Sequence, residues 1–329
     1  MDSRTVRSLK QQAQGRLEAC ENDPRTLALI HGGAALLAGL LTAVVSLVLN
    51  RVINNTGGLS DLGLRTVLGS ARTSFTVIVR ILLPFWSMGF TYCTLRIARG
   101  QDAPPKSLLE GFRRWGVILR LYLAQIAVCL LLLYLAIQVS GILVTISPFA
   151  DPLITRLTEI TGGELDLQTV TPEQTQALLE AMTPVYILVG VLFVAGGIPV
   201  FYRLRLAPYE ILGEDRPGAV RAMRNSVKRM RGSCMTLFRM DLGNWWYFAL
   251  SAVCSVLAYL DLLLPLAGVS LPVPEDVASV ACYVLYAVAM LPVYYFFSLR
   301  VETGYAVFHT YLPAAPEPPR REQNGYPRQ

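Results

Sequence analysis

Few residues in this chain of 329 have the types and spacing that catalysis or metal binding requires. It has two histidines, His31 and His309, and six cysteines, none of which forms a CxxC pair. HExxH, GxSxG, Walker-type and GxGxxG motifs do not occur in it. Two histidines without neighbouring cysteine ligands make a poor metal site. The sequence therefore predicts no catalytic residue, no metal ligand and no cofactor. An enzyme acting on lipid would need His31, His309, Glu210 and Asp241 to converge in one pocket.

Charge inside apolar stretches offers a second candidate site. Arg80 and Asp261 each lie about seven residues inside such a stretch, which at about 1.5 Å per residue is ~10 Å deep. Charge at that depth is costly and usually faces the interior of a helix bundle. Arg80 and Asp261 are therefore predicted to form an ion pair or to share an outward-facing polar cavity. The alternative is that Arg80 snorkels outward and Asp261 reaches the headgroups.

Long apolar stretches must position these residues. Hydrophobic residues make up 53% of the chain and charged residues 16%, against about 25% charged in soluble domains. A helix needs about 20 apolar residues to cross a hydrocarbon core about 30 Å thick, and backbone amides in lipid must be bonded within their own segment. The sequence therefore predicts an all-α polytopic membrane helix bundle. Six transmembrane helices are expected, at 27–49, 74–95, 117–146, 184–202, 245–266 and 277–299, the last continuing past Arg300.

The basic residues predict the orientation of these spans. Of 29 Lys and Arg residues, 23 lie in the two ends and in the segments after the second and fourth spans, whereas four lie in the other loops. Cytoplasmic segments carry the excess of Lys and Arg, so both ends are expected in the cytoplasm. Residues 1–26 then form a cytoplasmic N-terminal segment, 27–312 the membrane domain, and 313–329 a disordered, proline-rich cytoplasmic tail.

The outer loop over 147–183 is acidic, with Arg156 as its single basic residue. Its Thr171-Pro172-Glu173-Gln174 resembles a capping box, which predicts a short helix through Met182. In the first span, Ala35, Gly39 and Ala43 form a stripe of small residues that allows close packing within the monomer or between two copies.

The segment after the fourth span predicts a cytoplasmic, interfacial amphipathic helix. Asp215 can cap it, Pro217 fits its first turn, and Gly232 fits just past its end. Two stripes recur at spacings of three and four residues: apolar Val220, Met223, Val227 and Met230, and basic Arg221, Arg224, Lys228 and Arg231. The stripes adjoin, because one residue is about 100° of helix rotation. Such a helix can recognise an anionic lipid or a protein partner, or it can anchor the bundle at the headgroups without any specific ligand.

Three groups of residues resemble one known family. They are Gly89-Phe90 with Leu95–Gly100 and Leu108–Phe112; Tyr202–Glu210 (YRLRLAPYE) with Ala222, Ser226, Met230, Gly232, Leu237-Phe238, Asp241-Leu242 and Trp245; and Tyr305, Phe308 and Tyr311. Together they resemble domain of unknown function 975, an uncharacterised bacterial family, over most of residues 5–312. The chain departs from that family at Gly243-Asn244, where a serine-rich run is common. The resemblance implies a multi-pass protein of the cell membrane in bacteria with Gram-positive-type envelopes, and no reaction. The chain is also distantly similar to the membrane domain of some glycerophosphodiester phosphodiesterases, whose catalytic domain has no counterpart here.

Three functions fit these features. The first is a non-enzymatic membrane component that binds anionic lipid headgroups, or a protein partner, at its cytoplasmic face. The second is a transporter or permease with a polar cavity near Arg80 and Asp261; Pro84, Pro199 and Pro292 interrupt three spans and favour it, whereas no inverted repeat supports it. The third is an intramembrane lipid-modifying enzyme. Nucleic acid is not expected as a partner, because the basic residues lie beside apolar blocks.

Overall fold

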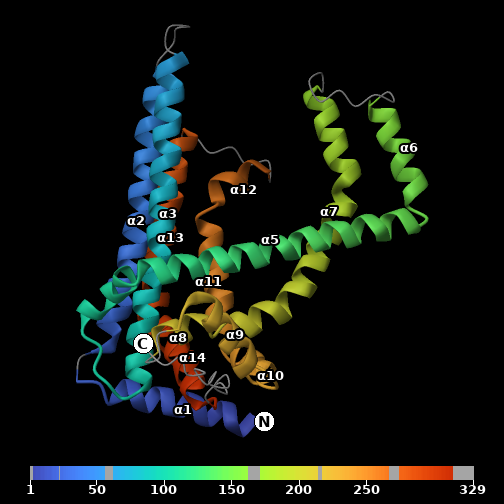
Figure 1. Ribbon diagram of the computed structural model, residues 1–329. Helices are drawn as coiled ribbons and strands as arrows, with labels where there is room; N and C mark the ends of the chain where they lie inside the picture. The colour runs from blue at the N-terminus through green and yellow to red at the C-terminus, as the bar shows by residue number, and fades with distance from the viewer. Residues whose placement is uncertain are drawn as a thin grey trace, which may run out of the picture. The chain divides into compact units, whose positions relative to one another are not determined.

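The computed structural model describes residues 3–21, 23–55, 62–161, 171–213, 217–266 and 274–313, and every element within these ranges is a helix (Figure 1). The prediction of an all-α fold is therefore confirmed. In chain order the helices are α1 Ser3–Glu18, α2 Pro24–Asn55, α3 Leu62–Ala98, the 3-10 helix η2 Pro105–Leu109, α4 Glu110–Arg113, α5 Trp115–Ile146, α6 Ala150–Thr161, α7 Pro172–Leu204, α8 Ala207–Leu212, α9 Ala219–Arg229, α10 Cys234–Leu242, α11 Trp245–Leu257, α12 Leu260–Leu266, α13 Glu275–Val293, the π-helical η3 Tyr294–Ser298 and α14 Leu299–Tyr311.

Five helical stretches of the described chain are long and apolar enough to cross a membrane, namely 24–54, 63–98, 115–146, 173–212 and 277–311. Large apolar side chains stay exposed along them, as at Leu130 (61%) and Ile187 (62%). A protein in water would bury such a surface, whereas lipid is its natural solvent. The chain is thus a multi-pass membrane protein of the helical type.

The predicted span at 245–266 is not a single helix. Trp245–Leu257 is a short apolar helix of 13 residues, and α12 follows after a turn. The turn forms because Ala258 and Tyr259 donate backbone hydrogen bonds three residues back, to Ser255 and Val256. Neither glycine nor proline marks this break in the sequence. Thirteen residues rise only about 20 Å, less than a hydrocarbon core needs, so six spans are not confirmed and the orientation of the ends stays a prediction.

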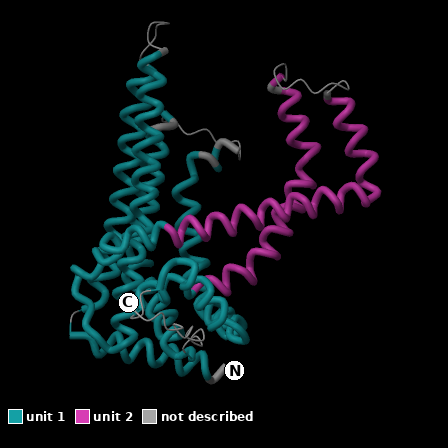
Figure 2. The backbone as a smooth tube through the Cα atoms, viewed as in Figure 1, with its two compact units in different colours: residues 1–119, 206–329 teal, residues 120–205 magenta. Residues whose placement is uncertain are grey.

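Two compact units make up the described chain (Figure 2): residues 1–119 with 206–329, and residues 120–205. In the first unit α2, α3 and α13 lie side by side (Figure 1), while α14 packs against α1 and α3. Its most deeply buried large side chains include Leu9 on α1, Leu95 on α3, and Tyr305 and Phe308 on α14. In the second unit α6 packs against α7.

Glycines permit close helix contacts at two places in the first unit: Gly89 and Gly111 where α3 meets the η2–α4 segment, and Gly39 where α2 meets α13. A Cβ added at Gly89 on α3 would overlap the backbone carbonyl of Leu108, and one added at Gly111 on α4 would overlap that of Phe85. A Cβ at Gly39 on α2 would overlap the hydroxyl of Tyr283 on α13. Packing within the monomer therefore accounts for Gly39 in the stripe of small residues.

The ends of several helices differ from the sequence-based expectations. Residues 3–18 form α1 because Leu9 and Ala13 recur at helical spacing and are buried. The capping box at Thr171 is confirmed, but its helix passes through Pro184 to Leu204 rather than ending near Met182. A membrane helix tolerates proline because neighbouring groups bond the carbonyl that proline leaves free. Gly218 caps α9, whereas Asp215 and the tail over 314–329 lie outside the described residues.

Candidate functional site

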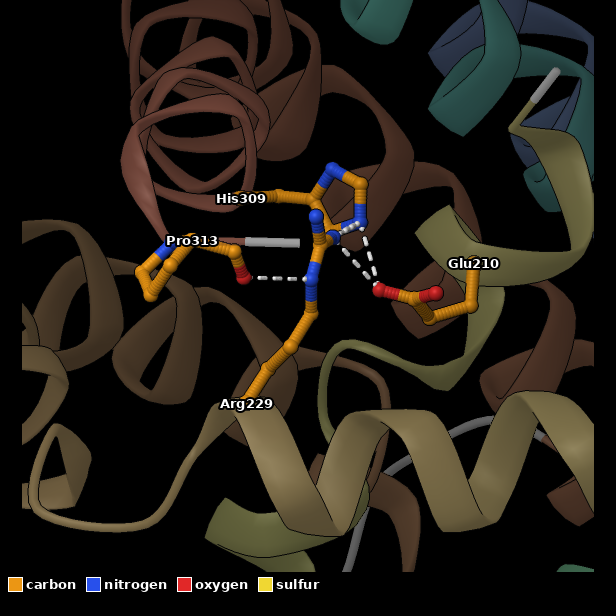
Figure 3. Close-up of polar contacts among 4 residues, drawn as sticks. All are labelled: Glu210, Arg229, His309 and Pro313. Carbon is orange, nitrogen blue, oxygen red and sulfur yellow. Dashed lines mark hydrogen bonds and ion pairs between the residues drawn. The ribbon is translucent and has the colours of Figure 1, made fainter. Parts of the chain in front are cut away.

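A buried polar cluster joins three helices of the first unit (Figure 3). Arg229 Nη1 lies 2.6 Å from Glu210 Oε1, and His309 Nε2 lies 2.9 Å from the same oxygen. Arg229 Nη1 also lies 2.7 Å from His309 Nε2, and Arg229 Nε donates to the carbonyl oxygen of Pro313 at 3.0 Å. The side chains of Glu210, Arg229 and His309 are 10%, 14% and 7% exposed, so water screens this ion pair weakly.

Short helices position the three side chains. Glu210 lies on α8, a helix of six residues held by the Arg114 side chain, which donates to the carbonyl of Ile211 at 3.0 Å. Arg229 is the last residue of α9, and Gly232 makes the following turn possible with φ +78°. His309 lies near the end of α14, whose residues from Leu299 to His309 are mostly buried. Segments far apart in the chain therefore meet at one carboxylate.

The three groups set one another's charge. Glu210 and His309 each lie two residues before the end of a long helical stretch, 173–212 and 277–311, and these stretches have 40 and 35 residues where about 20 suffice to cross a hydrocarbon core. Both residues lie outside the spans that the sequence predicts at 184–202 and 277–299. Burial alone would raise the pKa of Glu210, but the hydrogen bonds and charges of His309 and Arg229 outweigh it and lower that pKa below its usual value. Burial lowers the pKa of His309, although the Glu210 carboxylate opposes this shift. The cluster thus favours an ionised carboxylate, a guanidinium and a neutral imidazole.

One imidazole nitrogen cannot serve both neighbours at once. Neutral His309 can accept at Nε2 from Arg229 or donate there to Glu210, depending on its tautomer. Its other nitrogen, Nδ1, is buried and has no hydrogen-bond partner among the described residues. The ring stacks on Tyr209, with centroids 5.7 Å apart. Since Glu210 is already bound by Arg229, it is a poor general base, and the geometry fits a structural lock that ties α8, α9 and α14 together.

The other groups named for an enzyme lie elsewhere. Asp241 on α10 accepts a hydrogen bond of 2.5 Å from Tyr305, and His31 on α2 stacks on Phe90 with ring centroids 4.3 Å apart. Within the described ranges no group of three or more His, Cys, Asp or Glu side chains is placed to hold a metal ion. The four candidate groups therefore do not converge as one pocket; only Glu210 and His309 meet.

A basic surface lies on α9, formed by Arg221, Arg224, Lys228 and Arg231, the last just past its end. Arg221, Arg224 and Arg231 are exposed and Lys228 is half-buried. The side chains of these four residues form no hydrogen bond or ion pair with another residue of the described chain. Arg229, which falls outside this stripe, is the one cation of the helix that is bound by Glu210. Sequence reasoning counted Arg229 only as loop charge, although its absence from the stripe was a signal of a different role.

The apolar stripe on α9 divides along its length. Val220 is 69% exposed, whereas Met230 is fully buried. Further large apolar side chains are exposed after the turn at Gly232: Met235 at 60%, Leu242 at 60% and Trp246 at 68%. Basic and apolar groups are therefore both available to a ligand over α9–α11. This combination is typical of a protein surface at the membrane–water boundary.

The predicted intramembrane pair is not brought together. Arg80 is exposed on α3, and Asp261 lies in the first turn of α12 and is partly buried. No ion pair between these two residues occurs in the described chain. A shared function for Arg80 and Asp261 therefore stays a prediction. Pro84, Pro199 and Pro292 all lie inside helices, and the π-helical turn η3 begins two residues after Pro292.

One comparison with known proteins gives a match. The model of a family described as "Protein of unknown function (DUF975)" matches residues 19–298. Neither the curated proteins nor the solved structures contain a significant match to the chain. The segments that carried the resemblance meet in the fold, since Gly89 contacts Leu108 and Asp241 binds Tyr305. The similarity to glycerophosphodiester phosphodiesterases stays a prediction.

Proposed function

Since the chain belongs to the DUF975 family of unknown function, we propose from its surface that it is a non-enzymatic membrane component. It binds anionic lipid headgroups through the basic surface of α9. The membrane is the cell membrane of a bacterium, and α9 lies on its cytoplasmic side. The excess of Lys and Arg in alternate segments supports that orientation.

One observation carries the proposal: four cations on one short stretch have no partner in the described chain, while the fifth is bound inside. In a purely structural role these cations would form ion pairs within the protein, as Arg229 does with Glu210. Each Lys or Arg near an anionic leaflet contributes about 1 kcal/mol of attraction. Four such residues at helical spacing can therefore select anionic lipids over zwitterionic ones.

The apolar groups beside the basic surface favour a lipid over a protein partner. Val220 and Trp246 are exposed by more than two thirds. Side chains of this kind enter the boundary between headgroups and acyl chains, while the cations stay at the level of the phosphates. Binding of a protein partner instead of lipid is one outcome of the lipid-retention test.

Lipid retention by the full chain tests the proposal. The protein is purified in detergent from bilayers that mix phosphatidylglycerol and phosphatidylcholine, and the bound lipids are counted by native mass spectrometry. Replacing Arg221, Arg224, Lys228 and Arg231 by glutamine is expected to lower the enrichment of phosphatidylglycerol at least about tenfold.

A control variant with the same change in net charge shows whether the loss of lipid is specific to α9. It replaces four exposed cations outside α9, namely Arg7, Lys106, Arg113 and Arg300, by glutamine. Its enrichment of phosphatidylglycerol is expected to stay within twofold of the unsubstituted chain. Equal losses in both variants, or no loss in either, would contradict the proposal. Loss of a captured protein with unchanged lipid would assign the surface to a protein partner instead.

A further inference from the structure

A groove of about 650 Å³ lies within the second unit, between the end of α5, α6 and α7. Its lining includes Leu143, Phe149, Leu153, Arg156, Val185 and Leu188. This volume is within the range of about 300–1,000 Å³ that is typical of sites for small ligands. No residue that lines the groove belongs to the basic surface of α9, so the two sites share no residue.

Helical periodicity explains why the walls of the groove are apolar. Ala181, Val185 and Leu188 recur at i, i+4 and i+7, so they lie on one face of α7. After the turn that follows Ile146, α6 packs against α7, with Leu153 in the groove wall. Ala181 is 8% exposed, whereas Phe149 at the turn is 74% exposed. The groove is therefore closed on one side and open on another.

Arg156 gives the groove its charge. It is the one charged residue among those that line the groove, although α6 also carries Asp151 and Glu159. The side chain of Arg156 is exposed and forms no hydrogen bond or ion pair with any described residue. An arginine fork matches the geometry of a phosphate group and is weakly hydrated, so it suits an anion at the edge of an apolar site.

We propose that this groove holds an acyl chain of an anionic lipid whose phosphate-bearing headgroup pairs with Arg156. The apolar side chains of α5, α6 and α7 enclose the acyl chain of the lipid, and Arg156 holds its charged headgroup at the edge of the groove. The net charge of the lipid decides its affinity, because Arg156 is the sole charge that faces it in the described part of the groove. Zwitterionic lipids enter the same groove with lower occupancy.

Photo-crosslinking of the full chain tests this site directly. The protein is reconstituted in phosphatidylcholine nanodiscs that contain a trace of one of two probes. Both probes carry the same diazirine-bearing acyl chain, on phosphatidylglycerol in one and on phosphatidylcholine in the other. The anionic probe is expected to label peptides within 143–156 and 181–188 about fivefold more than the zwitterionic one. Equal labelling by the two probes would overturn the proposal without any variant being needed.

Three variants separate charge from shape. Arg156→Gln is expected to remove the preference for the anionic probe, and Arg156→Lys to retain most of it. Leu188→Trp fills the groove and is expected to lower labelling by both probes. A preference that survives Arg156→Gln would overturn the proposal, as would adducts spread evenly along all the apolar helices. The glutamine variant of the basic surface of α9 is expected to leave labelling at 143–156 unchanged, which distinguishes failure here from failure of the proposed function.

Discussion

Glu210 and Arg229 form the shortest ion pair of the buried cluster, with Oε1 and Nη1 2.6 Å apart. The two residues lie on consecutive helices, α8 and α9, and His309 joins them from 99 positions after Glu210. Removing one partner would leave the other charge buried without compensation, which is where the cost of a buried pair lies.

The first prediction concerns this pair. Arg229→Met is expected to lower the free energy of unfolding by about 3 kcal/mol, because Glu210 loses its cation at a buried position. Thermal or chemical unfolding in a fixed detergent measures it. Arg224→Met, on an exposed position of the same helix, is the matched control and is expected to change stability by less than about 0.5 kcal/mol. Combining Glu210→Gln with Arg229→Met is expected to cost less than the two separate losses added together; strict additivity would mean that the pair contributes nothing.

The second prediction concerns pH. Burial lowers the pKa of His309 from its ordinary value of 6.5, against the opposing effect of Glu210, while Arg229 and Arg99 add to the lowering. The unfolded chain therefore binds a proton before the folded chain does, and stability falls as pH is lowered through and below about 6.5. His309→Gln removes this group and is expected to flatten that part of the curve of stability against pH. Parallel curves for the two proteins would show that His309 does not titrate differently on folding.

The third prediction concerns the contact between α3 and η2. Gly89→Ala is expected to destabilise the protein by several kcal/mol or to prevent folding, because its Cβ meets the backbone of Leu108, which cannot move aside like a flexible side chain. Gly69→Ala is the matched control on the same helix, since nothing lies within 4 Å of its added Cβ. It is expected to stabilise α3 by about 0.5–1 kcal/mol. Yield and thermal unfolding of the two variants compare them, and equal behaviour would refute the close contact.

The fourth prediction concerns orientation. In a chain whose native cysteines are replaced by alanine or serine, Arg231→Cys is expected to react with a membrane-impermeant maleimide only after the cells are opened. Glu180→Cys on α7, also exposed, is expected to react in intact cells. The two sites lie in segments that the distribution of Lys and Arg assigns to opposite sides. Labelling of Arg231→Cys in intact cells would invert the proposed arrangement.

The long helices could be predicted from sequence because the requirement for about 20 apolar residues acts on each segment separately. Over 245–266 the same rule predicted one helix, whereas a turn with hydrogen bonds from Ala258 and Tyr259 divides this segment into α11 and α12 without a glycine or proline at the break. It also said nothing of α1, since only Leu9 and Ala13 mark its buried face in an otherwise polar segment.

Only part of the candidate site could likewise be predicted from the sequence. The stripe Arg221, Arg224, Lys228 and Arg231 could be read from local spacing, because neighbours on one helix face are three or four residues apart. Glu210 and His309 could not be paired in this way, since no local pattern relates residues on α8 and α14. The groove at Arg156 was missed for the same reason: its apolar walls come from the three helices α5, α6 and α7, and no local pattern relates residues on different helices.

The close approach at Gly89 and Gly111 also limits how such a protein can diverge. Each glycine leaves room for the backbone of the opposite segment, so a side chain gained at either position would have to push that segment away. The segment between Gly89 and Leu108 could lengthen or shorten only if each glycine still lay opposite its partner backbone. We therefore expect these two positions to serve as fixed landmarks when distant relatives are aligned, even where the lipid-facing residues have changed beyond recognition.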